Sequence, residues 1–117
     1  MRYAILLILM IIAFFSCRDV SYQNTLNINV QSDTIITLSN FDNKGNVFKL
    51  DFKVKGVLKE RIIMTQIIEN SFDYKHELIG EIDSVFGGDW YSNTCRLKFE
   101  NIETPIRLRI DYSFYDL

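Results

Sequence analysis

The sequence is poor in the residues that most often build metal and disulfide sites. It has one histidine, His76, and two cysteines, Cys17 and Cys95. A single histidine excludes a multi-histidine metal site, and two widely spaced cysteines provide neither a zinc-ligand spacing nor a disulfide framework. A Gly-rich phosphate-binding loop and a dinucleotide-binding fingerprint are also absent. We therefore expect no metal and no cofactor.

An excess of positive charge is also missing. The full chain carries a net charge of −2, and removal of the first sixteen residues would take away Arg2 and no acid, leaving 12 basic and 15 acidic side chains and a balance of −3. Proteins that bind nucleic acid without sequence preference need a basic face. This balance argues against a nucleic-acid partner and against electrostatic attraction to anionic lipid.

No apolar run is long enough to span a bilayer, but a shorter one stands at the N-terminus. Twelve apolar residues extend from Ala4 to Phe15, after Arg2 and before the small residue Ser16. As a helix this run rises about 18 Å, which is less than the hydrocarbon thickness of about 30 Å. A positive start, a short apolar centre and a small residue before a cut are typical of a secretory signal peptide.

The residues that end this run, Phe14-Phe15-Ser16-Cys17, resemble the lipobox of bacterial lipoproteins. The resemblance implies that Cys17 receives diacylglycerol and becomes the acylated N-terminus after cleavage of residues 1–16. Arg18 occupies the position where aspartate favours inner-membrane retention in the enterobacterial family, so the resemblance favours the outer membrane. An ordinary signal peptide and an uncleaved anchor are the alternatives.

The fate of Cys95 depends on Cys17. If Cys17 is acylated, Cys95 is left alone in an oxidising compartment, and we expect it to be buried and inert. If Cys17 is not acylated, a disulfide between the two becomes possible. The two outcomes exclude each other.

The chain beyond residue 24 has the alternation of half-buried strands. Residues 17–24 are expected to be the acylated cysteine and a short tether. Apolar and polar side chains alternate clearly from Phe48 to Gly56 and from Ile106 to Phe114. This alternation is typical of antiparallel sheets that have one solvent-exposed face. Residues 58–68 fit a helix or a strand, and their isoleucines favour a strand. About seven strands at roughly 8–12-residue spacing predict an all-β fold, a β-sandwich over residues 25–117, with a small open barrel as the alternative.

A predicted turn over residues 86–93 is the stretch most like a binding site. Its candidate residues are Gly87, Gly88, Asp89, Trp90 and Tyr91. Trp and Tyr stack on sugars or act as interface anchors, and glycines allow a partner to approach the backbone. The simpler interpretation, which we favour, is that the glycines form the turn and an aromatic ring closes the end of the core.

The remaining polar candidates are weaker. Asp83 and Asp89 flank the turn and could act as a general acid–base pair, but solvated acids near a turn are the simpler interpretation. His76 is expected on a strand, half exposed, and nothing in the sequence supplies a catalytic partner for it. A lysine row at residues 49, 53 and 55 could contact lipid headgroups or an acidic partner, or simply keep an outer face soluble.

These observations predict a function by exclusion. The leading hypothesis is a lipid-anchored, extracytoplasmic domain that binds a protein partner of the cell envelope and catalyses nothing. The alternative is a carbohydrate-active enzyme, an enzyme inhibitor or an immunity-type protein that uses the loop at Trp90. An acidic pair converging with Trp90 in one cleft would favour the enzyme.

Overall fold

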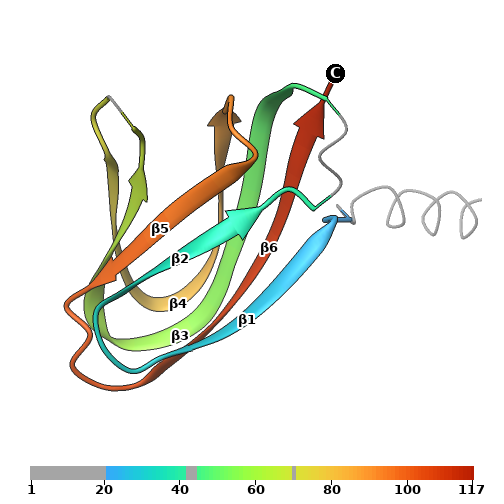
Figure 1. Cartoon of the computed structure of the whole chain (residues 1–117). Helices are drawn as coiled ribbons and strands as arrows, with labels where there is room; N and C mark the ends of the chain where they lie inside the picture. Colours follow the sequence, from blue (N-terminus) through green and yellow to red (C-terminus); the bar gives the residue numbers. More distant parts are fainter. Residues whose placement is uncertain (1–20, 42–44, 70) are drawn as a thin grey trace, which may run out of the picture.

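The computed structural model describes residues 21–41, 45–69 and 71–117. These residues form an all-β fold in which six antiparallel strands curl into a half-barrel (Figure 1). The strands are β1 (Asn24–Val30), β2 (Thr34–Ser39), β3 (Val47–Ile67), β4 (Tyr74–Asp89), β5 (Thr94–Glu100) and β6 (Ile106–Asp116). They follow the order β1-β6-β3-β5-β2, and β4 pairs with β3.

A sharp bend shared by β3 and β4 gives the sheet its shape. The pairing of the two strands shifts register between Leu58 and Ile62, and Gly80, opposite Leu58, has a φ of 74°. Such a bulge bends a strand and increases its twist. The rings of His76 and Phe86 lie ten residues apart on β4, about 33 Å along a straight strand, yet their centroids are 4.6 Å apart. β4 therefore folds back on itself.

The bend divides β3 between two neighbours. Its first half pairs with β6 up to Lys55, and its second half pairs with β5 from Ile63 onward, while β4 follows the other edge throughout. The predicted β-sandwich of about seven strands is therefore wrong. The two predicted runs, 48–56 and 58–68, belong to one continuous strand, β3. The two facing layers are therefore the two halves of a single curled sheet and not two separate sheets. The expected strand character of residues 58–68 is confirmed.

The core fills the concave face between the two arms of the half-barrel. The largest fully buried side chains are Phe52, Phe99, Phe114, Leu38, Leu50, Ile62, Met64, Leu97 and Ile110. The alternation in β5 and β6 correctly predicts which residues point inward. Phe48 is an exception: it was expected inside but is 38% exposed, because the pairing of β3 with β6 shifts between Val47 and Lys49.

Gly56 stands where β6 leaves β3, and a side chain there has no room. A Cβ atom would lie 2.7 Å from Leu108 Cδ2 and 2.9 Å from the carbonyl oxygen of Arg107. Because the second contact is backbone, the two strands would have to move apart. We expect Gly56→Ala to lower the free energy of unfolding by about 1–3 kcal/mol, the usual cost of overpacking.

Urea denaturation would measure that loss, with Val57→Ala as the control at the neighbouring position, where the side chain is 73% exposed. The control should stay within about 0.5 kcal/mol of the wild type. Equal stability of Gly56→Ala and the wild type would contradict the close approach of β6.

The residues of the predicted signal peptide and Cys17 lie outside the described ranges. Among the described residues, no helix has the length and apolar character needed to cross a membrane.

Candidate binding pocket

The predicted aromatic turn is shorter than expected, because β4 continues through Asp89. Only residues 90–93 connect β4 to β5. Gly87 lies opposite Asp51 in the sheet, where a Cβ would come within 2.8 Å of the carbonyl oxygen of Leu50. Gly87 therefore permits close packing of two strands instead of forming the turn.

Trp90 is fixed by hydrogen bonds at both its backbone and its side chain. Its amide donates to the Phe48 carbonyl oxygen at 3.2 Å, and its indole Nε1 donates to the Thr94 carbonyl oxygen at 3.0 Å. The ring is half-buried against the edge of the core. Tyr91, the next residue, is 79% exposed. The two aromatic residues therefore have different roles, since Trp90 closes the core and Tyr91 is free to contact a partner.

Asn40 ties this turn to the rest of the sheet. Its amide donates to the Asn93 carbonyl oxygen at 2.8 Å, and its side-chain Nδ2 donates to Asn93 Oδ1 and Asp116 Oδ1, both at 3.2 Å. The residue is buried, and buried polar groups with satisfied hydrogen bonds hold one arrangement. The turn is thus preorganised.

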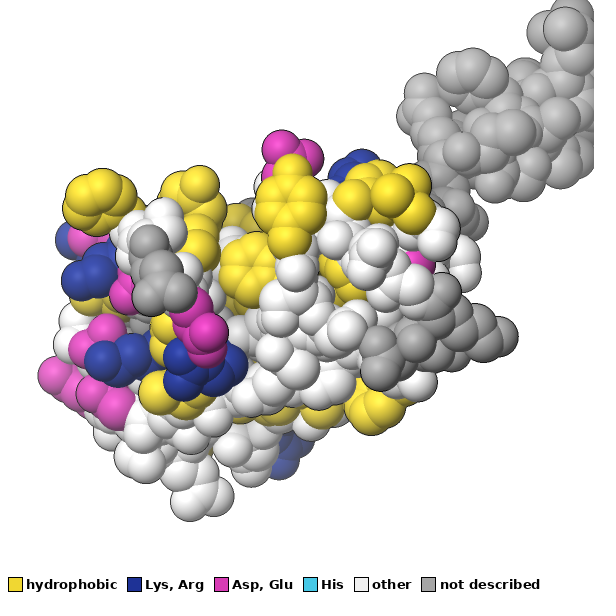
Figure 2. All heavy atoms as spheres, turned by 45° about the horizontal axis from the view of Figure 1, so that its top comes forward, with side chains coloured by type: hydrophobic (Ala, Val, Ile, Leu, Met, Phe, Trp, Pro, Cys, Tyr) yellow, Lys and Arg dark blue, Asp and Glu magenta, His cyan; other side chains and the backbone are white. Residues whose placement is uncertain are grey.

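The tip of the β3–β4 hairpin faces the turn across the mouth of the half-barrel. The Ile68 amide donates to Asp73 Oδ1 at 3.1 Å, which holds the tip together. Tyr74 is 59% exposed and Phe72 is 91% exposed. Figure 2 looks onto this end of the molecule and shows several groups of hydrophobic side chains at its surface.

A pocket of about 500 Å³ lies between the hairpin tip and the Trp90 turn. The apolar part of its wall comes from Ile67, Ile68, Tyr74, Trp90 and Tyr91. The two sides meet only because β3 and β4 bend, which returns the hairpin tip towards the turn (Figure 1). The pocket therefore forms only because the sheet is curled.

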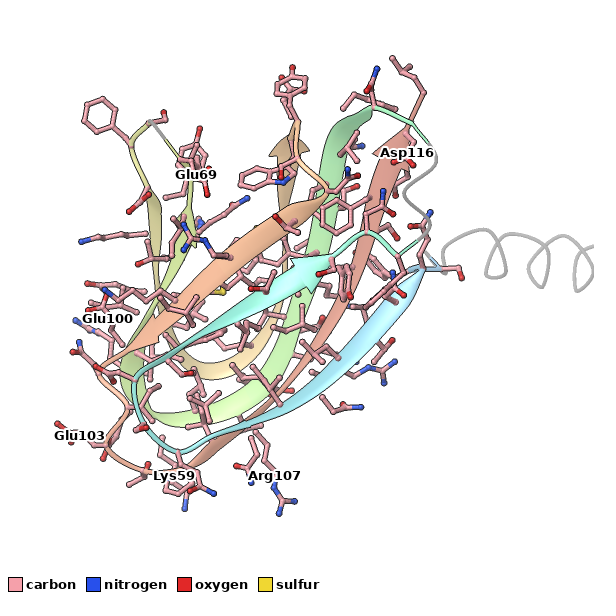
Figure 3. The ribbon with its side chains drawn as sticks, viewed as in Figure 1. Lys59, Glu69, Glu100, Glu103, Arg107 and Asp116 are labelled. Carbon is pink, nitrogen blue, oxygen red and sulfur yellow. The ribbon has the colours of Figure 1, made fainter. Side chains whose placement is uncertain are left out.

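Three charged residues line the pocket, Glu69, Asp89 and Arg96. Arg96 Nη2 lies 3.6 Å from Glu69 Oε1. Glu69 projects from the end of β3 at the hairpin tip (Figure 3). An exposed pair of this kind adds little stability, so its charges remain available to a ligand.

Asp83 and Asp89 are not brought together. They are six residues apart on β4, about 20 Å along a strand, and only Asp89 lines the pocket. The carboxylate of Asp83 lies 3.0 Å from Lys53 Nζ, and this hydrogen bond raises the pKa of Lys53. Convergence of both acids with Trp90 was the feature expected of an enzyme, and it is not found.

No protein-family model and no curated protein matches the chain. Among solved structures, the chain is similar to the Yersinia pseudotuberculosis-derived mitogen, with a TM-score of 0.49 and 13% sequence identity over 80% of this chain and 86% of that chain. This likeness is too low to support a functional inference.

Two further sequence candidates are placed by the structure. Cys95 is 1% exposed and faces the core, as expected for the case in which Cys17 is acylated. Burial raises the pKa of its thiol to about 12. His76 is half-buried on β4 and packs on Phe86, in agreement with the expected strand position.

The other half of the pocket was not predicted from the sequence. Tyr74 was not a candidate residue, although it begins β4 and lines the pocket. The available signal was two aromatic residues, Phe72 and Tyr74, in an otherwise polar stretch. Nothing in the pattern indicates that Tyr74 would share a pocket with Trp90, because that depends on the bend.

Proposed function

We propose that this protein is a lipid-anchored binding domain of the bacterial cell envelope, which holds a protein partner at the pocket and catalyses nothing. The anchor is Cys17, at the end of the lipobox-like segment. Cys17 precedes Ser21 by four residues, and four extended residues span at most about 14 Å. Acylation of Cys17 would therefore keep the domain close to the bilayer surface.

The observation that carries the binding proposal is the exposure of aromatic rings around a preorganised pocket. Tyr91 and Tyr74, which line the pocket, are 79% and 59% exposed, and Phe72 on the same hairpin tip is 91% exposed, although burial of such side chains is strongly favourable. Exposed apolar patches of this kind mark interaction surfaces.

The chemistry of the rim favours a protein as the ligand. The indole N–H of Trp90 is already bonded to Thr94, so Trp90 has no free donor for a ligand. The accessible groups are the rings and hydroxyls of Tyr74 and Tyr91. Tyrosine is enriched among the anchors of protein interfaces, because one end of the side chain is apolar and the other is polar. The Arg96–Glu69 pair then supplies a polar edge.

Photo-crosslinking in the native envelope tests the binding proposal. A benzophenone side chain placed at Tyr91 or at Tyr74 should yield the same protein adduct. The control is the same group at Val57, which is 73% exposed but does not line the pocket. Adducts that are identical at all three positions, or that carry glycan and no protein, would overturn the proposed protein partner.

Mass spectrometry of the membrane-extracted protein tests the anchor separately. The expected N-terminal peptide begins at acylated Cys17, with Cys95 as a free thiol. A retained Met1, or a disulfide between Cys17 and Cys95, would contradict the lipid anchor.

A further inference from the structure

A second hollow lies on the outer face of the sheet, where β6 separates from β3. The last pair between these strands is Lys55 with Arg109, and beyond it β3 bends away towards β5. The separation leaves a depression of about 350 Å³. Its polar lining consists of Lys55, Arg107, Arg109, Asn27 and Asn29, and no acidic residue lines it.

The positive charges in this hollow lie so close together that they destabilise the sheet. Lys55 and Arg109 are direct cross-strand neighbours, and like charges in that position destabilise a sheet. Asp83 is the opposite neighbour of Lys55 on β4, but its carboxylate lies 3.0 Å from Lys53 Nζ. Within the described part of the chain, neither Lys55 nor Arg107 has an ion-pair partner.

Arg109 is held in a defined orientation. Its Nε lies 3.1 Å from Asp111 Oδ1, and the same oxygen accepts a hydrogen bond from Thr25 Oγ1 at 2.6 Å. Asp111 uses only the Nε–H of the guanidinium. The terminal amino groups of Arg109 remain available to a ligand.

We propose that this hollow binds a multivalent oxyanion, through phosphate, sulfate or carboxylate groups. Two guanidinium groups offer the planar pairs of donors that match such oxygens, and Lys55 adds a point charge. Asn27 and Asn29 lie opposite Arg109 and Arg107 in the sheet and add side-chain amide donors. A bound anion would relieve the repulsion between Lys55 and Arg109.

The hollow is separate from the aromatic pocket and does not depend on its function. Arg107 projects outward at the lower end of the half-barrel, while Glu69 marks the pocket end above it (Figure 3). The whole chain has a net charge of −2, so the cations are concentrated locally on an otherwise acidic protein. The source of the oxyanion is either a free ion or a group carried by a polymer.

Calorimetric titration of the full-length protein in a non-ionic detergent tests this proposal. The two probes are inorganic tripolyphosphate, as a free oxyanion, and long-chain polyphosphate, as a polymer. The test variant Lys55→Gln/Arg107→Gln is compared with Lys59→Gln/Lys75→Gln, which removes the same charge elsewhere. We expect the test variant to lose about tenfold or more in affinity, because charge-assisted hydrogen bonds are lost, and the control to lose about twofold or less.

The thermal midpoint separates binding from folding. The test variant should melt at or above the wild-type temperature, because removing Lys55 relieves its repulsion with Arg109. Binding of tripolyphosphate would identify a free ion as sufficient, and binding of the polymer alone would identify a polymeric ligand. No binding of either probe to the wild type, or equal losses in the two double variants, would overturn the proposal.

Discussion

Replacing Phe52 with alanine should remove about 3–5 kcal/mol from the free energy of unfolding, the usual cost of deleting a buried aromatic ring. Phe52 is fully buried, and its ring stacks on that of Phe86 with centroids 5.4 Å apart. Phe86 in turn contacts His76 from the other arm of β4. The truncation therefore opens a cavity at the contact that joins the two arms.

Phe72→Ala is the matched control, because it makes the same chemical change at a side chain that is 91% exposed. It should cost about 0.5 kcal/mol or less. Urea denaturation followed by far-ultraviolet circular dichroism measures both variants. If Phe52→Ala fails to fold, Phe52→Leu provides a measurable intermediate loss. Equal losses for Phe52→Ala and Phe72→Ala would contradict the buried position of Phe52.

Cys95 should make the protein lose stability in alkali. Burial raises the pKa of its thiol from 9.0 to about 12 in the folded state. Below pH 9 the thiol is protonated in both states and has no effect. Between pH 9 and 12 the unfolded chain ionises and the folded one does not, so the free energy of unfolding falls by about 1.4 kcal/mol per pH unit.

The measurement compares the wild type with Cys95→Ala in urea at pH 8 and pH 10.5, under a reductant. Groups other than Cys95 titrate alike in both proteins, so their effects cancel. The alanine variant is expected to be less stable at pH 8. From pH 8 to pH 10.5 the free energy of unfolding of the wild type should fall by about 2 kcal/mol relative to that of the variant. A gap that is constant with pH would show that Cys95 titrates normally and is not buried.

Local alternation was sufficient to predict several strands and their inward faces. The side chains that point to the core as the period of two indicates are Cys95, Leu97 and Phe99 on β5 and Ile106, Leu108, Ile110, Tyr112 and Phe114 on β6. The burial of Cys95 was expected from the behaviour of a lone thiol, and it also agrees with the alternation of β5. The all-β class follows from the same local pattern.

The architecture could not be predicted in this way. A bulge between Leu58 and Ile62 lies within an otherwise strand-like run, so the pattern could not show whether one strand bends or two strands meet. The pocket depends on the same feature, since the bend brings Tyr74 towards Tyr91. The outer hollow was equally hidden, because Lys55 and Arg109 are neighbours only through the register of β3 with β6.

The position of β6 has a consequence for the order in which the strands assemble as the chain is synthesised. β6 is the last of the described strands in sequence order, yet it lies between β1, the first of them, and β3. It also supplies Ile110 and Phe114 to the core. The first strand has no partner in the described sheet until β6 arrives, so the chain cannot complete its core while the C-terminal strand is still emerging. If the protein is exported as proposed above, this late closure disfavours folding before the chain has crossed the membrane.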